Sequence, residues 1–394
     1  MQTENWIHPN TITGPPAEGV SYIRRPNLNQ EFWRELKKGS HILFTAPRRV
    51  GKTSVMKDLV ANPPDGFVCI YEDVESDQTL QEFYKRLYFL ILNRLGSFEK
   101  SKKILERWLK SRGIEEISME GSVKFKEKKL DYKEELLQLI KHLPELDKRV
   151  VLFLDEFPEV ISAIRRNEST DNAIELLHTI REIRLNKDFN HCTLVLAGSI
   201  GLEHVVESLD RLKLINDLHP VYIEPLTRDE AKLLISQITK GATIQWDRVH
   251  TETLLDRIKL LIPYFLQLMI EECDNILFKK NRRELENEDI GNAFEEIIRK
   301  NENLNDWKDR LKLPYIEKDE SSFCKKILTI LSHANSISIQ EIYNEAKSMT
   351  EPDNYMNLIK MLIRDGYITE ASEGNFRFSS PLLQAWWKKQ HPLI

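Results

Sequence analysis

The sequence predicts an α/β protein in which helices cover both faces of a parallel β-sheet. Five short, mostly apolar runs are typical of strands, and amphipathic stretches separate most of them: HILFTA, FVCIYEDV, RVVLFLDEF, CTLVLAGSI and VYIEPL. Strands of a parallel sheet are buried on both faces, so they read as nearly continuous apolar runs. After residue 226 the strand signals stop, and helical patterns follow. A chain of 394 residues is too long for one core, so we expect two or three domains.

Composition excludes several classes of protein. Hydrophobic residues make up 41% and charged residues 30%, which is typical of a soluble globular chain. The formal net charge of -5 gives no overall attraction to nucleic acid. The four cysteines are far apart and form no CxxC pair, which argues against zinc and favours buried thiols in a cytosolic protein. The N-terminus lacks the pattern of a signal peptide, and no apolar run could span a bilayer, so we expect a cytoplasmic location without membrane contact.

The chain divides into regions of different pattern. We expect an extended lead-in over 1–20, an αβ core over 21–226 and a charge-rich insertion at about 99–130. Residues 227–300 look entirely helical, as a small lid, and a polar connector follows over 301–320. Residues 321–394 predict three short helices and a two-stranded wing with Gly374 at its turn, an order that looks like a winged helix-turn-helix.

A basic loop lies between the first predicted strand and the helix after it. In A-P-R-R-V-G-K-T, residues 46–53, Gly51 would let the backbone approach a phosphate, Lys52 would reach the β- and γ-phosphates, and Thr53 would bind Mg²⁺. Ala46 stands where the standard phosphate loop has glycine. A plain strand-to-helix turn is the alternative. The residues expected to surround the nucleotide here are Ala46, Pro47, Arg48, Arg49, Val50, Gly51, Lys52, Thr53 and Ser54.

Two carboxylates end the third predicted strand. The carboxyl ends of parallel strands meet at one edge of a sheet, so Asp155 and Glu156 are expected beside the phosphate loop. Asp155 would then hold the Mg²⁺ shell, and Glu156 would orient or deprotonate the attacking water. At the end of the fourth strand, Ser199 lies where it could contact the γ-phosphate or the water, or it is an ordinary turn residue.

Several stretches resemble the STAND-type and archaeal-type ATPases of the AAA+ superfamily. GVSYIRRPNLNQEFWREL resembles the family's segment before the first helix, and APRRVGKTSVMKDL has its basic pair within the phosphate loop. VVLFLDEFPEVI, LAGSIGLEHVV and YIEPLTRDEAKLLI are similar to its hydrolysis strand, its Gly-Ser turn and the start of its helical lid. FRFSSPLLQAWWKKQ resembles the close of its winged-helix domain. The resemblance implies a P-loop NTPase sheet with a helical lid and a C-terminal winged helix.

The same resemblance implies further site residues. Tyr22 to Arg25 would lie over the base, and Pro263 would pack against the adenine or ribose, although Leu261 replaces the glycine of the family's Gly-x-Pro. Pro263 could instead be the first residue of a helix. Arg211 stands where many AAA+ proteins keep an arginine that acts on the neighbouring subunit, or it is a surface arginine. Sites of this kind often finish across a subunit boundary, which implies a homo-oligomer.

The sequence therefore predicts an ATPase, slow or stimulated by a partner, that acts as a switch and changes assembly or partner binding through its tail. ATP and Mg²⁺ are the expected ligands, because the Asn-Lys-x-Asp run that marks guanine binding is absent. A nucleotide-regulated DNA-binding protein would also fit, but residues 321–394 hold eight Lys/Arg and seven Asp/Glu, which gives little basic surface. An adaptor that binds ATP without turnover is a second possible function. The ATPase subunit of a defence or toxin-type system, with its effector on another chain, is a third.

Overall fold

In the computed structural model, the residues described are 6–97, 99–111, 114–117, 123–125, 130–143, 149–198, 201–300, 304–312, 316, 318–348 and 354–392. They belong to two compact units. The first unit draws its described residues from 1–25, 46–55 and 223–394, and the second from 26–45 and 56–222. Each unit is treated separately below.

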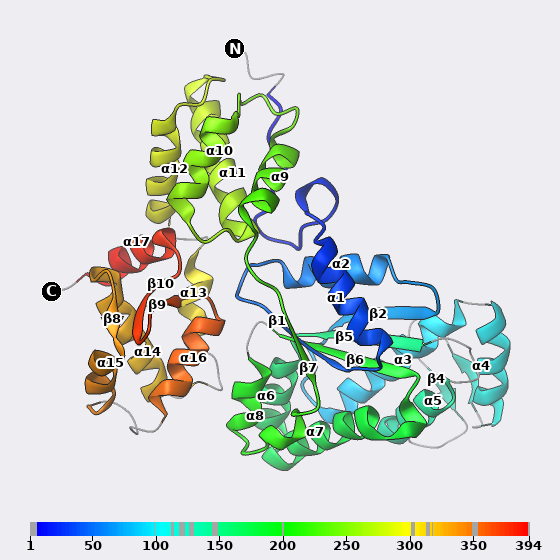
Figure 1. Ribbon diagram of the computed structural model, residues 1–394. Helices are drawn as coiled ribbons and strands as arrows, with labels where there is room; N and C mark the ends of the chain where they lie inside the picture. Colours follow the sequence, from blue (N-terminus) through cyan, green and yellow to red (C-terminus); the bar gives the residue numbers. More distant parts are fainter. Residues whose placement is uncertain are drawn as a thin grey trace. The chain divides into compact units, whose positions relative to one another are not determined.

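The second unit contains the predicted parallel sheet. Its strand order is β2-β5-β6-β1-β7, and every pairing is parallel (Figure 1). The strands are β1 (Ile42–Thr45), β2 (Phe67–Asp73), β5 (Arg149–Asp155), β6 (Cys192–Ala197) and β7 (His219–Tyr222). All residues of β6, and all of β5 after Arg149, are buried, as the apolar runs predicted. The predicted αβ fold class is confirmed.

Helices cover the sheet of the second unit. They are α1 (Pro26–Lys37), α2 (Lys52–Ala61, whose first turn belongs to the first unit), α3 (Leu80–Gly96), α5 (Tyr132–Lys141), α6 (Phe157–Asn167), α7 (Thr170–Leu185) and α8 (Leu202–Glu207). The short helices η3 (Lys187–Phe189) and η4 (Leu212–Leu214) lie in loops. Phe32 of α1 stacks on Phe153 of β5 with ring centroids 5.6 Å apart and meets Phe44 of β1 edge-on, so α1 packs against the sheet.

The charged insertion forms a helix and a hairpin. The helix is α4 (Glu99–Ser111), and β3 (Ile114–Ile117) pairs antiparallel with β4 (Val123–Phe125). The sequence predicted a charge-rich insertion here, without a strand at 114–117. The run IEEI, residues 114–117, does not alternate between apolar and polar residues, so its strand signal is weak. Pairing with β4 accompanies the strand here.

In the first unit, residues 227–300 form α9 (Arg228–Thr239), α10 (Arg248–Ile258), α11 (Pro263–Lys280) and α12 (Asn287–Lys300). These residues are mostly helical, with one isolated bridge between Gln245 and Glu284. Residues 19–21 form η1 (Gly19–Ser21). Within the predicted polar connector lies α13 (Asn305–Arg310), where Trp307 is buried against Phe265 of α11 and Tyr367.

The C-terminal elements follow the order expected for a winged helix. They are α14 (Lys318–His333), β8 (Ile337–Ser338), α15 (Ile339–Ala346), α16 (Tyr355–Arg364), β9 (Ile368–Ser372), β10 (Asn375–Phe378) and α17 (Pro381–Gln390). The strands form a small antiparallel sheet in the order β8-β10-β9, and Gly374 has φ +70° at the turn between β9 and β10. Trp386 and Trp387 of α17 are fully buried, so they serve packing.

Two further expectations can be compared with the structure. All four cysteines are buried and free, and desolvation raises the pKa of the Cys69 and Cys192 thiols to about 12, which keeps both protonated. Among the described residues, no helix combines the length and the apolar character that a membrane crossing requires.

Candidate nucleotide-binding site

The predicted phosphate loop connects the end of β1 to the start of α2. Two of its residues have left-handed backbone, Arg49 with φ +61° and Gly51 with φ +98°. A Cβ atom at Gly51 would meet nothing within 4 Å, so the glycine is required by the backbone conformation and not by crowding. Left-handed residues between right-handed ones turn successive N–H groups towards one point, which makes an anion-binding concavity. The loop therefore has the backbone that a phosphate needs.

The chemistry-bearing residues lie in the first turn of α2. Lys52 is the first residue of this helix and is buried, with 8% of its surface exposed. Thr53 and Ser54 follow it in the same turn, and Ser54 is buried as well. The N-terminus of a helix carries free N–H groups and a positive partial charge. A phosphate bound there would meet both the lysine and the helix dipole.

A small apolar pocket adjoins the loop within the first unit, with an empty volume of about 330 Å³. That figure includes open solvent and the gaps between atoms, and the space that a molecule could occupy is only about 30 Å³. The pocket is therefore a shallow apolar recess beside the loop and does not enclose a ligand. Of the predicted site residues, it is lined by Tyr22, Arg25, Val50, Gly51, Ser54 and Pro263. Ile23, within the predicted range Tyr22 to Arg25, also lines it. The sequence did not predict the remaining lining residues, which are Ala17, Ser21, Val55, Leu226 and Leu234.

Hydrogen bonds to the lid helices hold the segment that carries Tyr22. Asn10 N–H donates to the Ile238 carbonyl over 2.8 Å, and Ile12 N–H donates to Gln267 Oε1 over 2.8 Å. Gln267 Nε2 then donates to the Ser21 carbonyl over 3.3 Å. The predicted extended lead-in is thus paired with α9 and α11, and this pairing fixes one wall of the pocket.

Arg25 and Pro263 stabilise the backbone around the pocket. The Arg25 guanidinium is buried and donates to the carbonyls of Glu224 and Pro225, over 2.8 and 3.1 Å. Pro263 is the first residue of α11, where a missing N–H costs nothing. The two roles that the sequence suggests for Pro263 are therefore compatible, because it begins a helix and also faces the pocket.

Two contacts join the loop to further parts of the first unit. The Arg49 guanidinium lies over the ring of Tyr264 in α11, 4.7 Å from its centroid. Gly366 lies just after α16, and a Cβ atom there would come within 3.1 Å of the Pro47 side chain. The loop therefore contacts both the lid and the C-terminal elements.

The carboxylate pair lies at the carboxyl edge of the sheet in the second unit. Asp155 is the last residue of β5 and is 1% exposed. Its Oδ1 accepts the Glu156 N–H over 3.0 Å, and its Oδ2 accepts the Tyr71 hydroxyl over 3.2 Å. Glu156 is the N-cap of α6 and has φ +55°, an uncommon conformation that non-glycine residues adopt at a cost of order 1–3 kcal/mol.

Sequence reasoning missed the acidic surroundings of this pair. Asp73 ends β2 and is the register partner of Asp155, and Glu75 follows two residues later. Desolvation raises the pKa of Glu75, and the charges of Glu156, Asp73 and Asp155 raise it further. The signal was present in YEDVE, because neighbouring parallel strands that both end in acids place those acids side by side.

The last two predicted site residues are Ser199 and Arg211. Ser199 lies outside the described residues. Arg211 is exposed at the start of η4, where it donates to the carbonyl of its own neighbour Asp210 over 2.9 Å. The placement of Arg211 is compatible with either a surface residue or an arginine offered to another molecule.

The side chains suit magnesium. The expected ligands Thr53 and Asp155 offer hydroxyl and carboxylate oxygen, the donors that a hard cation prefers. Among the described residues, no group of three or more His, Cys, Asp or Glu could hold an ion by itself. Nucleotide-bound Mg²⁺ usually takes one or two protein ligands and completes its shell with phosphate oxygens and water.

Comparison with known proteins identifies the class. The AAA domain family matches residues 34–206, a range that contains the phosphate loop and the carboxylate pair. The Walker-type ATPase of Pyrococcus abyssi is similar in structure, with a TM-score of 0.62 and 15% identity over 94% of this chain and 100% of that chain. The ORC2 protein of Aeropyrum pernix, in its ADPNP-ADP complexes, has a TM-score of 0.52 and 14% identity over 98% of this chain and 96% of that chain. No curated protein matches the sequence.

The fold is that of the AAA+ P-loop nucleoside triphosphatases. Within it, residues 34–206 are an AAA domain. The prediction of an AAA+ nucleotide-binding core is confirmed over residues 34–206.

Proposed function

We propose that this protein is an ATP-binding and ATP-hydrolysing switch of the STAND or archaeal ATPase type. One observation carries the proposal: the phosphate loop, with Gly51 at φ +98°, borders an apolar pocket lined by Tyr22 and Pro263. An anion-binding loop beside an apolar recess suits a nucleotide, which has a charged phosphate end and a largely apolar base.

The proposed roles follow from chemistry and position. Lys52 neutralises phosphate charge, Thr53 and Asp155 hold Mg²⁺, and Glu156 orients and deprotonates the attacking water. Bound Mg²⁺ would supply charge neutralisation at the β- and γ-phosphate oxygens. These roles rest on the motif and on the position of each residue in its own element, at the start of α2 for Lys52 and Thr53 and at the end of β5 for Asp155. Ser199 and Arg211 are proposed contacts to the γ-phosphate, from this chain and from a neighbouring copy respectively.

The switch would act through contacts of the phosphate loop. Arg49 lies over Tyr264 of the lid, and Pro47 lies beside Gly366 of the C-terminal elements. A change of the loop on hydrolysis would alter both contacts, so the lid and the tail would respond to the γ-phosphate. We expect the output to be a change in self-assembly or in binding to a protein partner in the cytoplasm.

The test is steady-state phosphate release from Mg·ATP, with size determination on the same samples with and without ATP. Glu156→Gln should bind ATP but release phosphate at least about 100-fold more slowly, because a positioned general base contributes at least that factor. The control variant is Glu159→Gln, which removes a carboxylate from the first turn of the same helix. Equal rates in wild type and Glu156→Gln would refute the role of Glu156, and absence of ATP binding would refute the function.

The same experiment distinguishes the switch from the adaptor, because tight ATP binding without turnover by the wild type would identify an adaptor. For DNA binding, a salt-dependent shift with duplex DNA is the discriminating result. The wing exposes two acids, Glu370 and Glu373, beside one base, Arg377, so its charge gives DNA little attraction. An effector on another chain, as in a defence system, would be found by adding candidate partners to the ATPase assay.

A further inference from the structure

A tyrosine on the neighbouring strand contacts the proposed magnesium carboxylate. β2 pairs with β5 in parallel register, with Tyr71 opposite Phe153 and Asp73 opposite Asp155. The Tyr71 hydroxyl extends to Asp155 and donates to its Oδ2 over 3.2 Å. The phenol hydroxyl is the donor in this contact, because a carboxylate oxygen can only accept.

Both oxygens of Asp155 are therefore anchored. The Glu156 N–H holds Oδ1, and the Tyr71 hydroxyl holds Oδ2. The residue is 1% exposed, so solvent offers no competing donors. A carboxylate fixed at both oxygens presents its remaining lone pairs in one direction, which lowers the reorganisation needed when a cation or its water arrives.

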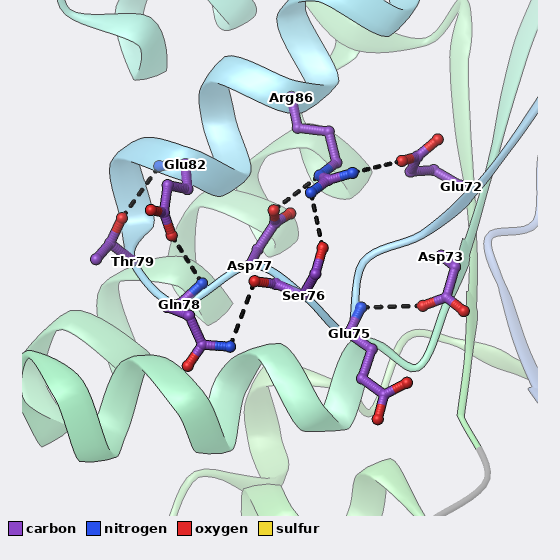
Figure 2. Close-up of polar contacts among 9 residues, drawn as sticks. All are labelled: Glu72, Asp73, Glu75, Ser76, Asp77, Gln78, Thr79, Glu82 and Arg86. Atoms are coloured by element: carbon purple, nitrogen blue, oxygen red, sulfur yellow. Dashed lines mark hydrogen bonds and ion pairs between the residues drawn. The ribbon is translucent and has the colours of Figure 1, made fainter.

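The strand end that carries Tyr71 is itself held in place. Arg86 of α3 donates to Glu72 and to Asp77, each over 2.7 Å, and to the Ser76 hydroxyl over 2.8 Å (Figure 2). On the other side, the Val74 N–H donates to the Asp155 carbonyl over 3.1 Å. These bonds fix the backbone just after Tyr71. The phenol thus projects from a rigid element.

We propose that Tyr71 is a positioning residue that orients the Asp155 carboxylate towards the nucleotide-bound cation and so sets the affinity for that cation. The inference rests on the proposed function, because it requires Asp155 to face a divalent ion. It predicts that removal of one hydroxyl weakens cation binding in the ternary complex while binding of the nucleotide alone stays unchanged.

The test uses Mn²⁺, whose binding is read by electron paramagnetic resonance, with a non-hydrolysable ATP analogue. Tyr71→Phe should weaken Mn²⁺ binding about tenfold, the usual order for loss of a hydrogen bond to a charged group. Affinity for the analogue in excess EDTA should equal that of the wild type. The matched control is Tyr84→Phe on α3, because Tyr84 is also buried in the second unit but its hydroxyl lies near Thr179.

The outcomes distinguish this inference from the proposed function. A loss of Mn²⁺ affinity in Tyr71→Phe alone supports the role of Tyr71, even if the wild type proves unable to hydrolyse ATP. Equal Mn²⁺ affinities in wild type and Tyr71→Phe would overturn it, as would an equal loss in Tyr84→Phe. A wild type that hydrolyses ATP alongside an unaffected Tyr71→Phe leaves the ATPase intact and removes only the inference. A wild type that binds neither analogue nor Mn²⁺ overturns both.

Discussion

His41, the residue before β1, should make the second unit sensitive to acid. Its Nδ1 accepts the Leu194 N–H over 3.0 Å, so the ring is neutral there, and protonation would break this bond. Desolvation, followed by the nearby charge of Arg184, lowers the pKa of His41 from 6.5 to about 4. The unfolded chain therefore binds a proton at His41 at a higher pH than the folded chain does.

The sign and size of the effect follow from linkage. Between pH 6.5 and pH 4 the unfolded state binds more protons at His41, so the stability of the unit falls as the pH falls through this window. At about 1.4 kcal/mol for each pH unit, the full effect is about 3 kcal/mol. Between pH 7.5 and pH 5.0 the loss should be about 2 kcal/mol.

The assay is urea unfolding at pH 7.5 and pH 5.0, read by pulsed hydrogen–deuterium exchange of peptides from β1 and β6. Carboxylates also titrate near pH 5, so His41→Asn is the informative variant, because its amide oxygen can accept the Leu194 N–H without titrating. The pH-dependent loss should be about 2 kcal/mol smaller in His41→Asn than in the wild type. His178→Asn, on the exposed side of α7, should keep the wild-type loss. If His41→Asn loses as much stability as the wild type, the reasoning is refuted.

Two further substitutions test local features of the site and of its support. Gly51→Ala places a side chain on a backbone with φ +98°, a strain of roughly 1–2 kcal/mol. It should therefore weaken binding of a fluorescent ATP analogue about tenfold. The control Gly96→Ala, at a position of ordinary φ, should bind the analogue as the wild type does. Arg86→Met leaves the Asp77 carboxylate, 2% exposed, without its cation and should lower the free energy of unfolding by about 1–3 kcal/mol, measured by urea titration. Adding Asp77→Asn should recover part of that loss. If Arg86→Met leaves the free energy of unfolding unchanged, the Arg86 bonds in Figure 2 contribute nothing to stability.

Several helix starts could have been located from sequence because their signals are local. Thr227 with Glu230, and Ser338 with Glu341, form complete capping boxes at the starts of α9 and α15. Such boxes need only residues three apart, so distant contacts hardly affect them. The phosphate loop is local in the same sense, since a glycine, a lysine and a threonine in succession lie between a strand and a helix.

The fifth strand illustrates where a local pattern is insufficient. The sequence predicted VYIEPL, but β7 spans His219–Tyr222 and pairs with β1 up to Tyr222. Beyond Tyr222 the backbone is hydrogen-bonded to other groups. The Arg25 guanidinium donates to the Glu224 carbonyl, and the Leu226 N–H donates to the Leu261 carbonyl. Apolar residues alone cannot indicate which partner will satisfy a backbone group.

The sequence by itself determined the class of fold, the phosphate loop and the carboxylate pair, because apolar periodicity and short motifs act over a few residues. Only tertiary structure decided that Tyr22 and Pro263 line one pocket, that Glu156 adopts φ +55°, and that Tyr71 donates to Asp155. Each of these depends on strand order or on the packing of distant segments. The physical reason is that the sequence gives the identity of each side chain, whereas the residues it contacts depend on how distant parts of the backbone are arranged.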